Sequence, residues 1–154
     1  MFVLVGTGAL RDELVTWCRE RGVADNVRFV GWTSHQRMPA FYNTADLVVM
    51  TSEAEGVFRV YIEALACERP LLASDIPAAR EVIDDGGNGF LFPLGDHRVL
   101  AERILALLGD AALRGEVGRR GRASVAHRSL DGAASAYLRE LQAFLSGSQQ
   151  IRNA

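Results

Sequence analysis

A short segment, residues 51–70, carries the residues best suited to chemistry. Glu55 and Glu63 are carboxylates with seven residues between them, and Gly56 follows Glu55 directly. A glycine permits a tight turn at that point. Glu63 falls about two turns into the helix predicted over 58–67, where its carboxylate is suited to accept two charge-assisted hydrogen bonds from a ribose cis-diol. The segment therefore predicts a loop and a helix that present two acids to a ligand.

The start of that helix predicts an anion site. The first amides of a helix have no partner within it, and the helix dipole adds partial positive charge there. We therefore expect a diphosphate at the amides of Gly56, Val57 and Phe58. Arg59 is suited equally to that diphosphate or to a nearby acid. On local sequence alone, the two glutamates also fit a solvated loop and an exposed helix face.

Strands alternating with helices must position this segment. Short apolar runs predict strands at 2–5, 27–30, 46–50, 71–74 and 89–92. Helical spacing predicts helices at about 10–22, 36–44, 58–67, 78–83, 96–108, 111–127 and 131–145. This order is typical of an α/β fold, a Rossmann-like doubly wound parallel sheet of about five strands with helices on both faces. Ligands of such folds bind beyond the carboxyl ends of the strands, which selects the loops 6–9, 31–35, 51–57, 74–77 and 93–96.

Further details of this fold follow from local patterns. The run 46–50 is apolar on both faces, as in a buried parallel strand. Asp96 is expected to cap one helix and Pro77 to open another. The helix over 58–67 should face the core with Tyr61, Ile62, Leu65 and Ala66. We expect one domain over 1–146 and a flexible tail over 147–154.

Composition excludes several classes of protein. The chain has 154 residues, 49% of them hydrophobic, with a net charge of −2, which argues against a dedicated nucleic-acid binder. All 17 basic residues are arginine, so a Walker-type phosphate loop, a kinase lysine and Schiff-base chemistry are excluded within this chain. The histidines have no metal-ligand spacing, and Cys18 and Cys67 are expected to be free thiols of a reducing compartment. The apolar start of the chain reads as a strand and not a signal peptide, which favours the cytoplasm.

The motifs along the chain resemble those of the retaining nucleotide-sugar glycosyltransferases of the GT-B fold, in particular family 4, or "group 1". Glu55-Gly56 and Glu63-Ala64-Leu65-Ala66 match the family signature E-G-x-x-x-x-x-x-E-A-L-A. Similar motifs lie in order on both sides, at 5–11 (VGTGALR), 27–31 (VRFVG), 42–46 (YNTAD), 70–75 (PLLASD), 81–83 (EVI) and 86–89 (GGNG). The resemblance covers about 2–145.

The resemblance implies a role for each matching residue. Glu55 would contact hydroxyls of the transferred sugar and is the candidate catalytic residue, and Glu63 would hold the ribose. The donor would also meet Gly8 in the cleft, Trp32 and Thr33 near the base, and Gly56, Val57, Phe58 and Arg59 at the sugar and diphosphate. The substrate would be a UDP- or GDP-linked sugar, with no metal and no cofactor in the site.

Several departures from the family also matter. Phe58 stands where the family usually has Gly or Pro, and Glu68 replaces a helix-ending glycine. This sequence lacks three parts of the family: the N-terminal acceptor-binding domain, one further strand, and a loop with an Arg and a Lys that bind the diphosphate. We therefore expect this chain to be the C-terminal, donor-binding half of a GT-B enzyme with its first strand missing. The chain alone is expected to transfer no sugar. Any membrane contact is expected to come only through the missing half.

Two alternatives remain open. The first is a non-catalytic partner subunit derived from such a domain, which the missing Arg/Lys loop and Phe58 favour. The second is a nicotinamide-binding Rossmann domain. Gly6 and Gly8 begin that fingerprint, but Arg11 occupies the position of its third glycine. The nucleobase, the sugar, the acceptor and the oligomeric state are not encoded in any recognisable motif, and polysaccharide biosynthesis is expected only from the resemblance.

Overall fold

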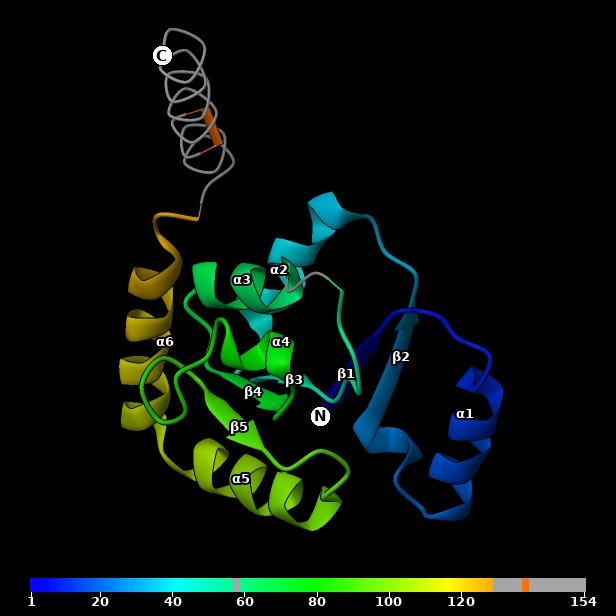
Figure 1. The fold of residues 1–154 in the computed structure, drawn as a ribbon. Helices are drawn as coiled ribbons and strands as arrows, with labels where there is room; N and C mark the ends of the chain where they lie inside the picture. The colour runs from blue at the N-terminus through cyan, green and yellow to red at the C-terminus, as the bar shows by residue number, and fades with distance from the viewer. Residues whose placement is uncertain (57–58, 129–136, 139–154) are drawn as a thin grey trace, which may run out of the picture. The chain divides into compact units, whose positions relative to one another are not determined.

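The computed structural model describes residues 1–56, 59–128 and 137–138 (Figure 1). The chain divides into two compact units, Met1–Phe41 and Tyr42–Ala154. The described residues form five parallel strands, as expected, but these make two hydrogen-bonded sets, a pair and a sheet of three. Strands alternate with helices in a Rossmann-like α/β arrangement, so the expected fold class is confirmed.

The first unit is built on two parallel strands, β1 (Phe2–Val5) and β2 (Val27–Gly31), joined by the helix α1 (Arg11–Glu20) and a 3-10 turn (Ala24–Asn26). A second 3-10 turn (His35–Arg37) follows β2. Three apolar residues at helical spacing, Leu10 just before α1 and Leu14 and Trp17 on it, are open to solvent, with 62%, 42% and 47% of their surface exposed. The guanidinium of Arg21 lies 4.7 Å from the centre of the Trp17 ring, where its charge favours the aromatic face.

The second unit contains the sheet β3-β4-β5, formed by β3 (Val48–Met50), β4 (Leu71–Ser74) and β5 (Phe90–Phe92). All of its pairs are parallel. Each residue of β4 is buried because this strand lies between two neighbours. The run 46–50 was predicted to be a buried strand, and its burial was overestimated. Strand β3 is an edge of its sheet, and its residues are only half-buried.

Helices surround this sheet. The helix α2 (Met38–Thr44) crosses the boundary between the units, and α3 (Arg59–Ala66), α4 (Pro77–Arg80), α5 (His97–Gly109) and α6 (Ala111–Val125) follow in the second unit. Leu72, Phe92 and Leu107 form a buried cluster between the sheet and α5. The two predicted helix starts are confirmed. Pro77 is the first residue of α4, and Asp96 Oδ1 accepts hydrogen bonds from the amides of Arg98 and Val99.

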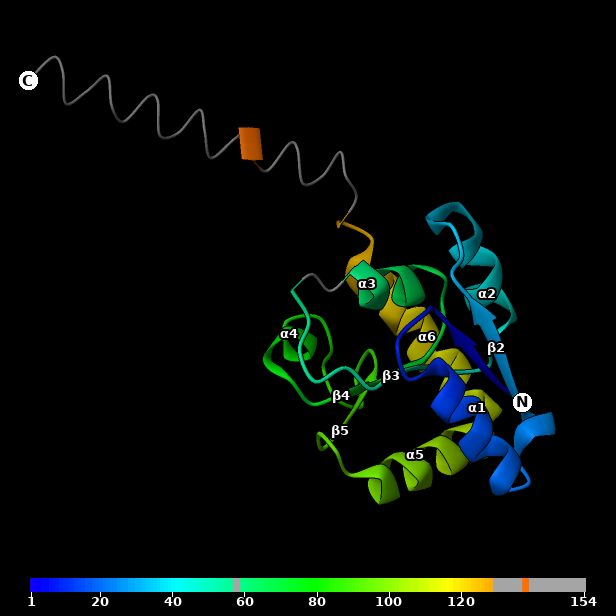
Figure 2. The same ribbon diagram turned by 90° about the vertical axis from the view of Figure 1, so that its right-hand side faces the viewer.

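The helices α3 and α6 lie side by side in both views (Figures 1 and 2). Glycines on α6 allow this approach: a Cβ on Gly118 would lie 2.4 Å from the Glu68 carbonyl oxygen. Glu68 itself ends α3 with a φ of 59°, the left-handed conformation that glycine prefers. The amides of Glu68 and Arg69 donate to the carbonyls of Leu65 and Ala64, the bonding pattern of a Schellman motif.

The inward face of α3 differs from the predicted one by one residue. Tyr61 and Leu65 are 1% and 0% exposed, as expected, and Ile62 is half-buried. Ala66 was assigned to the core wrongly, because it is exposed and Ala64 is buried in its place. With Tyr61 and Leu65 fixed inward, residue 64 rather than 66 falls within the buried arc of a helix of 3.6 residues per turn.

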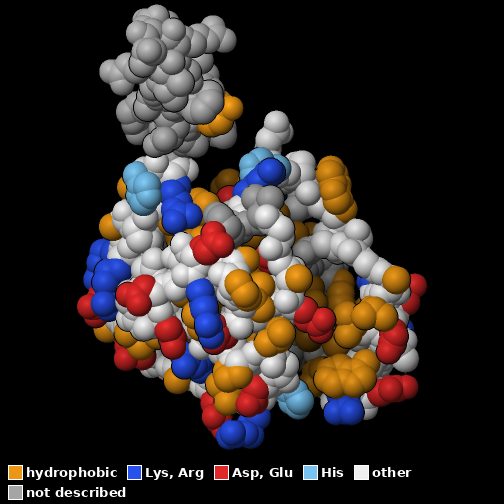
Figure 3. Space-filling view, viewed as in Figure 1, with side chains coloured by type: hydrophobic (Ala, Val, Ile, Leu, Met, Phe, Trp, Pro, Cys, Tyr) orange, Lys and Arg blue, Asp and Glu red, His pale blue; other side chains and the backbone are white. Residues whose placement is uncertain are grey.

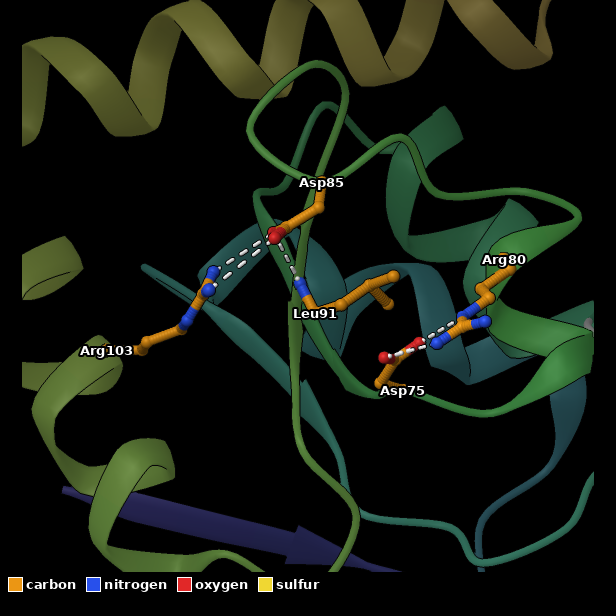
Figure 4. Close-up of polar contacts among 5 residues, drawn as sticks. All are labelled: Asp75, Arg80, Asp85, Leu91 and Arg103. Atoms are coloured by element: carbon orange, nitrogen blue, oxygen red, sulfur yellow. Dashed lines mark hydrogen bonds and ion pairs between the residues drawn. The ribbon is translucent and has the colours of Figure 1, made fainter.

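Within the second unit, two acidic side chains bind loops to the neighbouring helices and strand (Figure 4). Asp85 Oδ1 accepts hydrogen bonds from the amide of Leu91 at 2.9 Å and from Nη1 of Arg103 at 3.0 Å, which joins the loop before β5 to α5. Asp75, directly after β4, is bound by both guanidinium nitrogens of Arg80 that face it, with Nη2 at 2.7 Å from Oδ2. Positive and negative side chains are interspersed over the face shown in Figure 3, in keeping with the small net charge.

The remaining sequence predictions concern the cysteines and the C-terminal segment. Cys18 is buried and Cys67 half-buried, and both are free thiols, as expected. The helix predicted over 131–145 and the tail over 147–154 lie outside the described residues, apart from two helical residues, Tyr137 and Leu138.

Candidate functional site

The loop after β3 positions Glu55. Because the strand ends at Met50, the following residues lie at the carboxyl edge of the sheet, where α/β folds bind ligands. Ser52 Oγ donates a hydrogen bond to Glu55 Oε1 at 2.6 Å. This short contact, three residues apart in the loop, holds one carboxylate oxygen of Glu55 in place.

The helix α3 positions Glu63, and a neighbouring helix holds it. Tyr42, on α2 and only 4% exposed, donates its hydroxyl hydrogen to Glu63 Oε2 at 3.1 Å. Burial, and then the negative charge of Glu63, raise the pKa of Tyr42 above its ordinary range. The phenol therefore stays protonated and remains a donor, and the carboxylate is half-buried and oriented before any ligand arrives.

A second tyrosine lies within electrostatic range of the other glutamate. Tyr61 is 1% exposed, and burial followed by the negative charge of Glu55 raises its pKa. Its hydroxyl has no hydrogen-bond partner among the described residues. Glu55 and Glu63 therefore each have a neutral phenol nearby.

The residues between the two glutamates are only partly described. Gly56 has no positive φ, and a Cβ added to it would meet nothing within 4 Å, so the tight turn that glycine permits does not depend on glycine at this position. The open space in front of Gly56 leaves room for a ligand. Val57 and Phe58, whose amides were expected to bind phosphate, lie outside the described residues. Arg59 is the first residue of α3 and is exposed.

The first unit brings its own predicted residues to one end of its strand pair. The amide of Gly6 donates to the carbonyl of Gly31 at 2.8 Å, so the loops after β1 and β2 lie side by side. A Cβ added to Gly8 would likewise meet nothing within 4 Å, and Trp32 is 77% exposed. An exposed indole beside an open glycine loop is suited to cover a flat ring. Thr33 follows directly and is half-buried.

Sequence reasoning did not single out Tyr42 and Ser52 as site residues. Tyr42 stands in the motif at 42–46, but its contact spans 21 positions and depends on how α2 packs beside α3. Ser52 is three residues before Glu55, a spacing typical of local side-chain contacts in loops, so its role was accessible from the sequence. In the described ranges, no three His, Cys, Asp or Glu side chains are grouped to hold a metal ion. None of the helices in the described part of the chain is long and apolar enough to cross a membrane.

Comparison with known proteins gives several related sequences. The chain is 33% identical over 113 residues to an alpha-D-kanosaminyltransferase of Streptomyces kanamyceticus, which covers 73% of this chain and 29% of that protein. It is 31% identical over 139 residues to the lipopolysaccharide core biosynthesis glycosyltransferase LpsE of Rhizobium meliloti, covering 90% and 40%. The chain thus spans less than half the length of these relatives.

The chain is also similar to solved structures. The chain superposes on sucrose-phosphate synthase of Thermosynechococcus elongatus with a TM-score of 0.83 and 29% identity, over 95% of this chain and 38% of that one. It superposes on Anabaena HepE in complex with UDP-glucose with a TM-score of 0.78 and 28% identity, over 94% and 40%. The family model "Glycosyl transferases group 1" matches residues 1–124. The chain therefore belongs to the group 1 glycosyltransferase family.

Proposed function

We propose that this chain is the donor-binding half of a retaining GT-B glycosyltransferase, which binds a nucleoside-diphosphate sugar for transfer to an acceptor. The pair formed by Tyr42 and Glu63 carries the proposal. A half-buried carboxylate held by a buried phenol is a rigid, charged acceptor, and a ribose cis-diol supplies the two hydroxyl donors that it fits. The UDP-glucose complex of the similar HepE structure supports a nucleotide-sugar ligand.

The remaining parts of the proposed site follow from the same loops. Glu55, fixed by Ser52, would accept hydrogen bonds from hydroxyls of the transferred sugar, and Gly56 leaves space for it. The leaving diphosphate would be stabilised by amides and arginines without a metal ion. We further propose that transfer takes place in the cytoplasm and requires an acceptor-binding domain, so the isolated chain binds donor weakly and transfers nothing.

Calorimetric titration of the purified chain with UDP, GDP, ADP and NAD tests this function. We expect one nucleoside diphosphate to bind and NAD not to bind. Glu63→Gln should weaken that binding roughly tenfold or more, since hydrogen bonds to a charged group contribute about 1.5–3 kcal/mol. Glu81→Gln, which changes an exposed carboxylate of the same unit, is the matched control. Binding of NAD alone would overturn the proposal in favour of a nicotinamide domain.

The role of Tyr42 gives a finer test. Tyr42→Phe keeps the buried ring and removes the hydrogen bond that fixes Glu63. The variant should lose affinity for UDP by a few fold while its affinity for 2′,3′-dideoxy-UDP stays unchanged, because that analogue offers Glu63 no hydroxyl. Equal losses for both nucleotides would mean that the phenol acts on the fold and not on the ribose. If the chain is folded by circular dichroism and binds no nucleotide at all, the non-catalytic partner subunit is the better assignment.

A further inference from the structure

The strand β1 exposes side chains on both faces of the pair β1-β2. Phe2 and Leu4 point to one face and Val3 to the other, because side chains alternate along a strand. Their exposed fractions are 54%, 42% and 49%. Two residues of β2 are exposed, and none of β3, β4 or β5 is. Among the described strands, β1 is therefore the one with the least cover.

The pair β1-β2 is also incomplete as a sheet. Parallel sheets are as a rule covered on both faces, and two strands alone form only a marginally stable sheet. Within the described strands β1 is hydrogen-bonded to β2 alone, so the backbone groups along its other edge have no strand partner. An exposed row of backbone N–H and C=O groups is a site at which a further strand can add.

The side chains of β1 determine which strand fits. The strand has the sequence FVLV, without a charge, a proline or any of the other features that keep an edge strand from pairing. A strand that adds to this edge continues both apolar faces, so a charged side chain on it would lie against Phe2 and Leu4 or against Val3. The partner must therefore be uncharged and apolar on both faces, and β1 of a second copy of this chain meets both requirements.

Two-fold symmetry allows this pairing. An axis perpendicular to the sheet would pair β1 with its copy in antiparallel orientation, and opposite residues would lie on the same face with Cβ atoms about 5 Å apart. With the axis between Val3 and Leu4, Phe2 would lie opposite Val5 of the second copy and Val3 opposite Leu4. Every cross-strand pair would then be apolar, and no like charges would meet. Two-fold dimers are the commonest closed assemblies of identical chains.

The available area predicts a weak dimer. The exposed half of a phenylalanine amounts to roughly 100 Å², so Phe2, Val3 and Leu4 together offer roughly 250 Å² per copy. A stable interface buries about 800 Å² per partner. Backbone hydrogen bonds along the edge add to the affinity, but the area sets its scale. We expect a dissociation constant on the order of 0.1–1 mM.

We propose that the free edge of β1 is an interaction surface for a second copy of this chain, which forms a dimer through antiparallel pairing of the two β1 strands. The inference goes beyond the proposed function, because Glu55 and Glu63 belong to the other unit, Tyr42–Ala154. It holds whether or not the chain binds a nucleotide.

Sedimentation velocity of the full chain between about 10 μM and about 2 mM tests the dimer. We expect the weight-average mass to rise with concentration towards that of a dimer. Hydrogen exchange measured at the same concentrations locates the contact. Amides of residues 2–5 should exchange more slowly at the high concentration, whereas amides of β4, which lies between two neighbouring strands, should not change. A chain that stays monomeric, a mass that rises past the dimer, or exchange at residues 2–5 that does not depend on concentration overturns the proposal.

A pair of variants makes the contact specific. Val3→Lys places a charge in the middle of the proposed interface and should weaken the dimer at least tenfold. Val30→Lys makes the same change on β2, at a residue that is 37% exposed in the same unit, and should weaken the dimer less than twofold. Circular dichroism shows whether each variant is folded. Equal effects of the two changes contradict pairing through β1, and if Val3→Lys does not fold, the amide exchange of the unchanged chain decides.

Discussion

The close packing of α6 against α3 predicts opposite effects for one substitution at two glycines. Gly118 is buried, and a Cβ there would lie 2.4 Å from the Glu68 carbonyl oxygen. Gly115, one turn earlier, is exposed, and its added Cβ would meet only Nη1 of Arg119, at 3.5 Å. Backbone near Glu68 must therefore retreat by roughly 0.9 Å in Gly118→Ala to regain an ordinary carbon–oxygen distance of about 3.3 Å.

The magnitude follows from two opposing contributions. Alanine is favoured over glycine in a helix interior by about 1 kcal/mol, and this gain applies to both positions. Overpacking a well-packed site costs about 1–3 kcal/mol, and only Gly118→Ala incurs it. We expect Gly115→Ala to raise the free energy of unfolding by about 0.5–1 kcal/mol and Gly118→Ala to lie about 1–3 kcal/mol below it.

Urea unfolding of both variants measures this difference. Helical circular dichroism reports mainly on the second unit, which contains α3, α5 and α6, with a smaller contribution from α1. Tryptophan fluorescence is an internal control, because both tryptophans, Trp17 and Trp32, belong to the unit Met1–Phe41 and should report an unchanged transition there. If the free energies of unfolding of the two variants, obtained from circular dichroism, agree within about 0.5 kcal/mol, the close approach of α6 to Glu68 does not affect stability, and the packing argument fails.

Three further changes are predicted from contacts of single side chains. Glu68→Gly should raise the free energy of unfolding by about 0.5–1 kcal/mol, measured in urea, because the strain relieved at the left-handed position outweighs the loss of the exposed ion pair with Arg122. Glu68→Ala keeps the strain and should not stabilise the chain. The pKa of Tyr42 is raised in the folded chain, so its contribution to the free energy of unfolding is complete below about pH 10. That contribution declines at higher pH, because the tyrosine of the unfolded chain ionises first. The free energy of unfolding of Tyr42→Phe should therefore fall less steeply with rising pH than that of the unchanged chain. The hydrogen bond from Arg80 lowers the pKa of Asp75, so the contribution of this carboxylate to stability is lost as the pH falls below about 4. In Asp75→Asn this part of the decrease in thermal midpoint at low pH should be absent, which a pH series of thermal unfolding measures.

The order of elements could be predicted from the sequence because each is short and bounded by clear signals. The mainly apolar runs of four to five residues are followed by glycine, proline or a polar residue, and Asp96 and Pro77 begin helices for local reasons. The left-handed position at Glu68 was visible as a departure from a glycine pattern. The half-burial of β3 was not visible, because an edge strand and a central strand of a parallel sheet have the same apolar sequence.

The candidate site was predictable as a segment but not as a network. The spacing of Glu55 and Glu63 located the segment, and the structure places each on the loop or helix expected. The hydroxyl of Tyr42 reaches Glu63 across two helices, and no periodic pattern encodes such a contact.

The strand β1 has a consequence for how this chain behaves in concentrated solution. Phe2, Val3 and Leu4 are 54%, 49% and 42% exposed on alternating faces, and within the described strands β1 is hydrogen-bonded only to β2. An uncharged, exposed strand with a free edge is a template on which further extended segments assemble. Colloidal stability should therefore depend on this strand more than on net charge, and a single charge in place of Val3 should delay the onset of turbidity on heating.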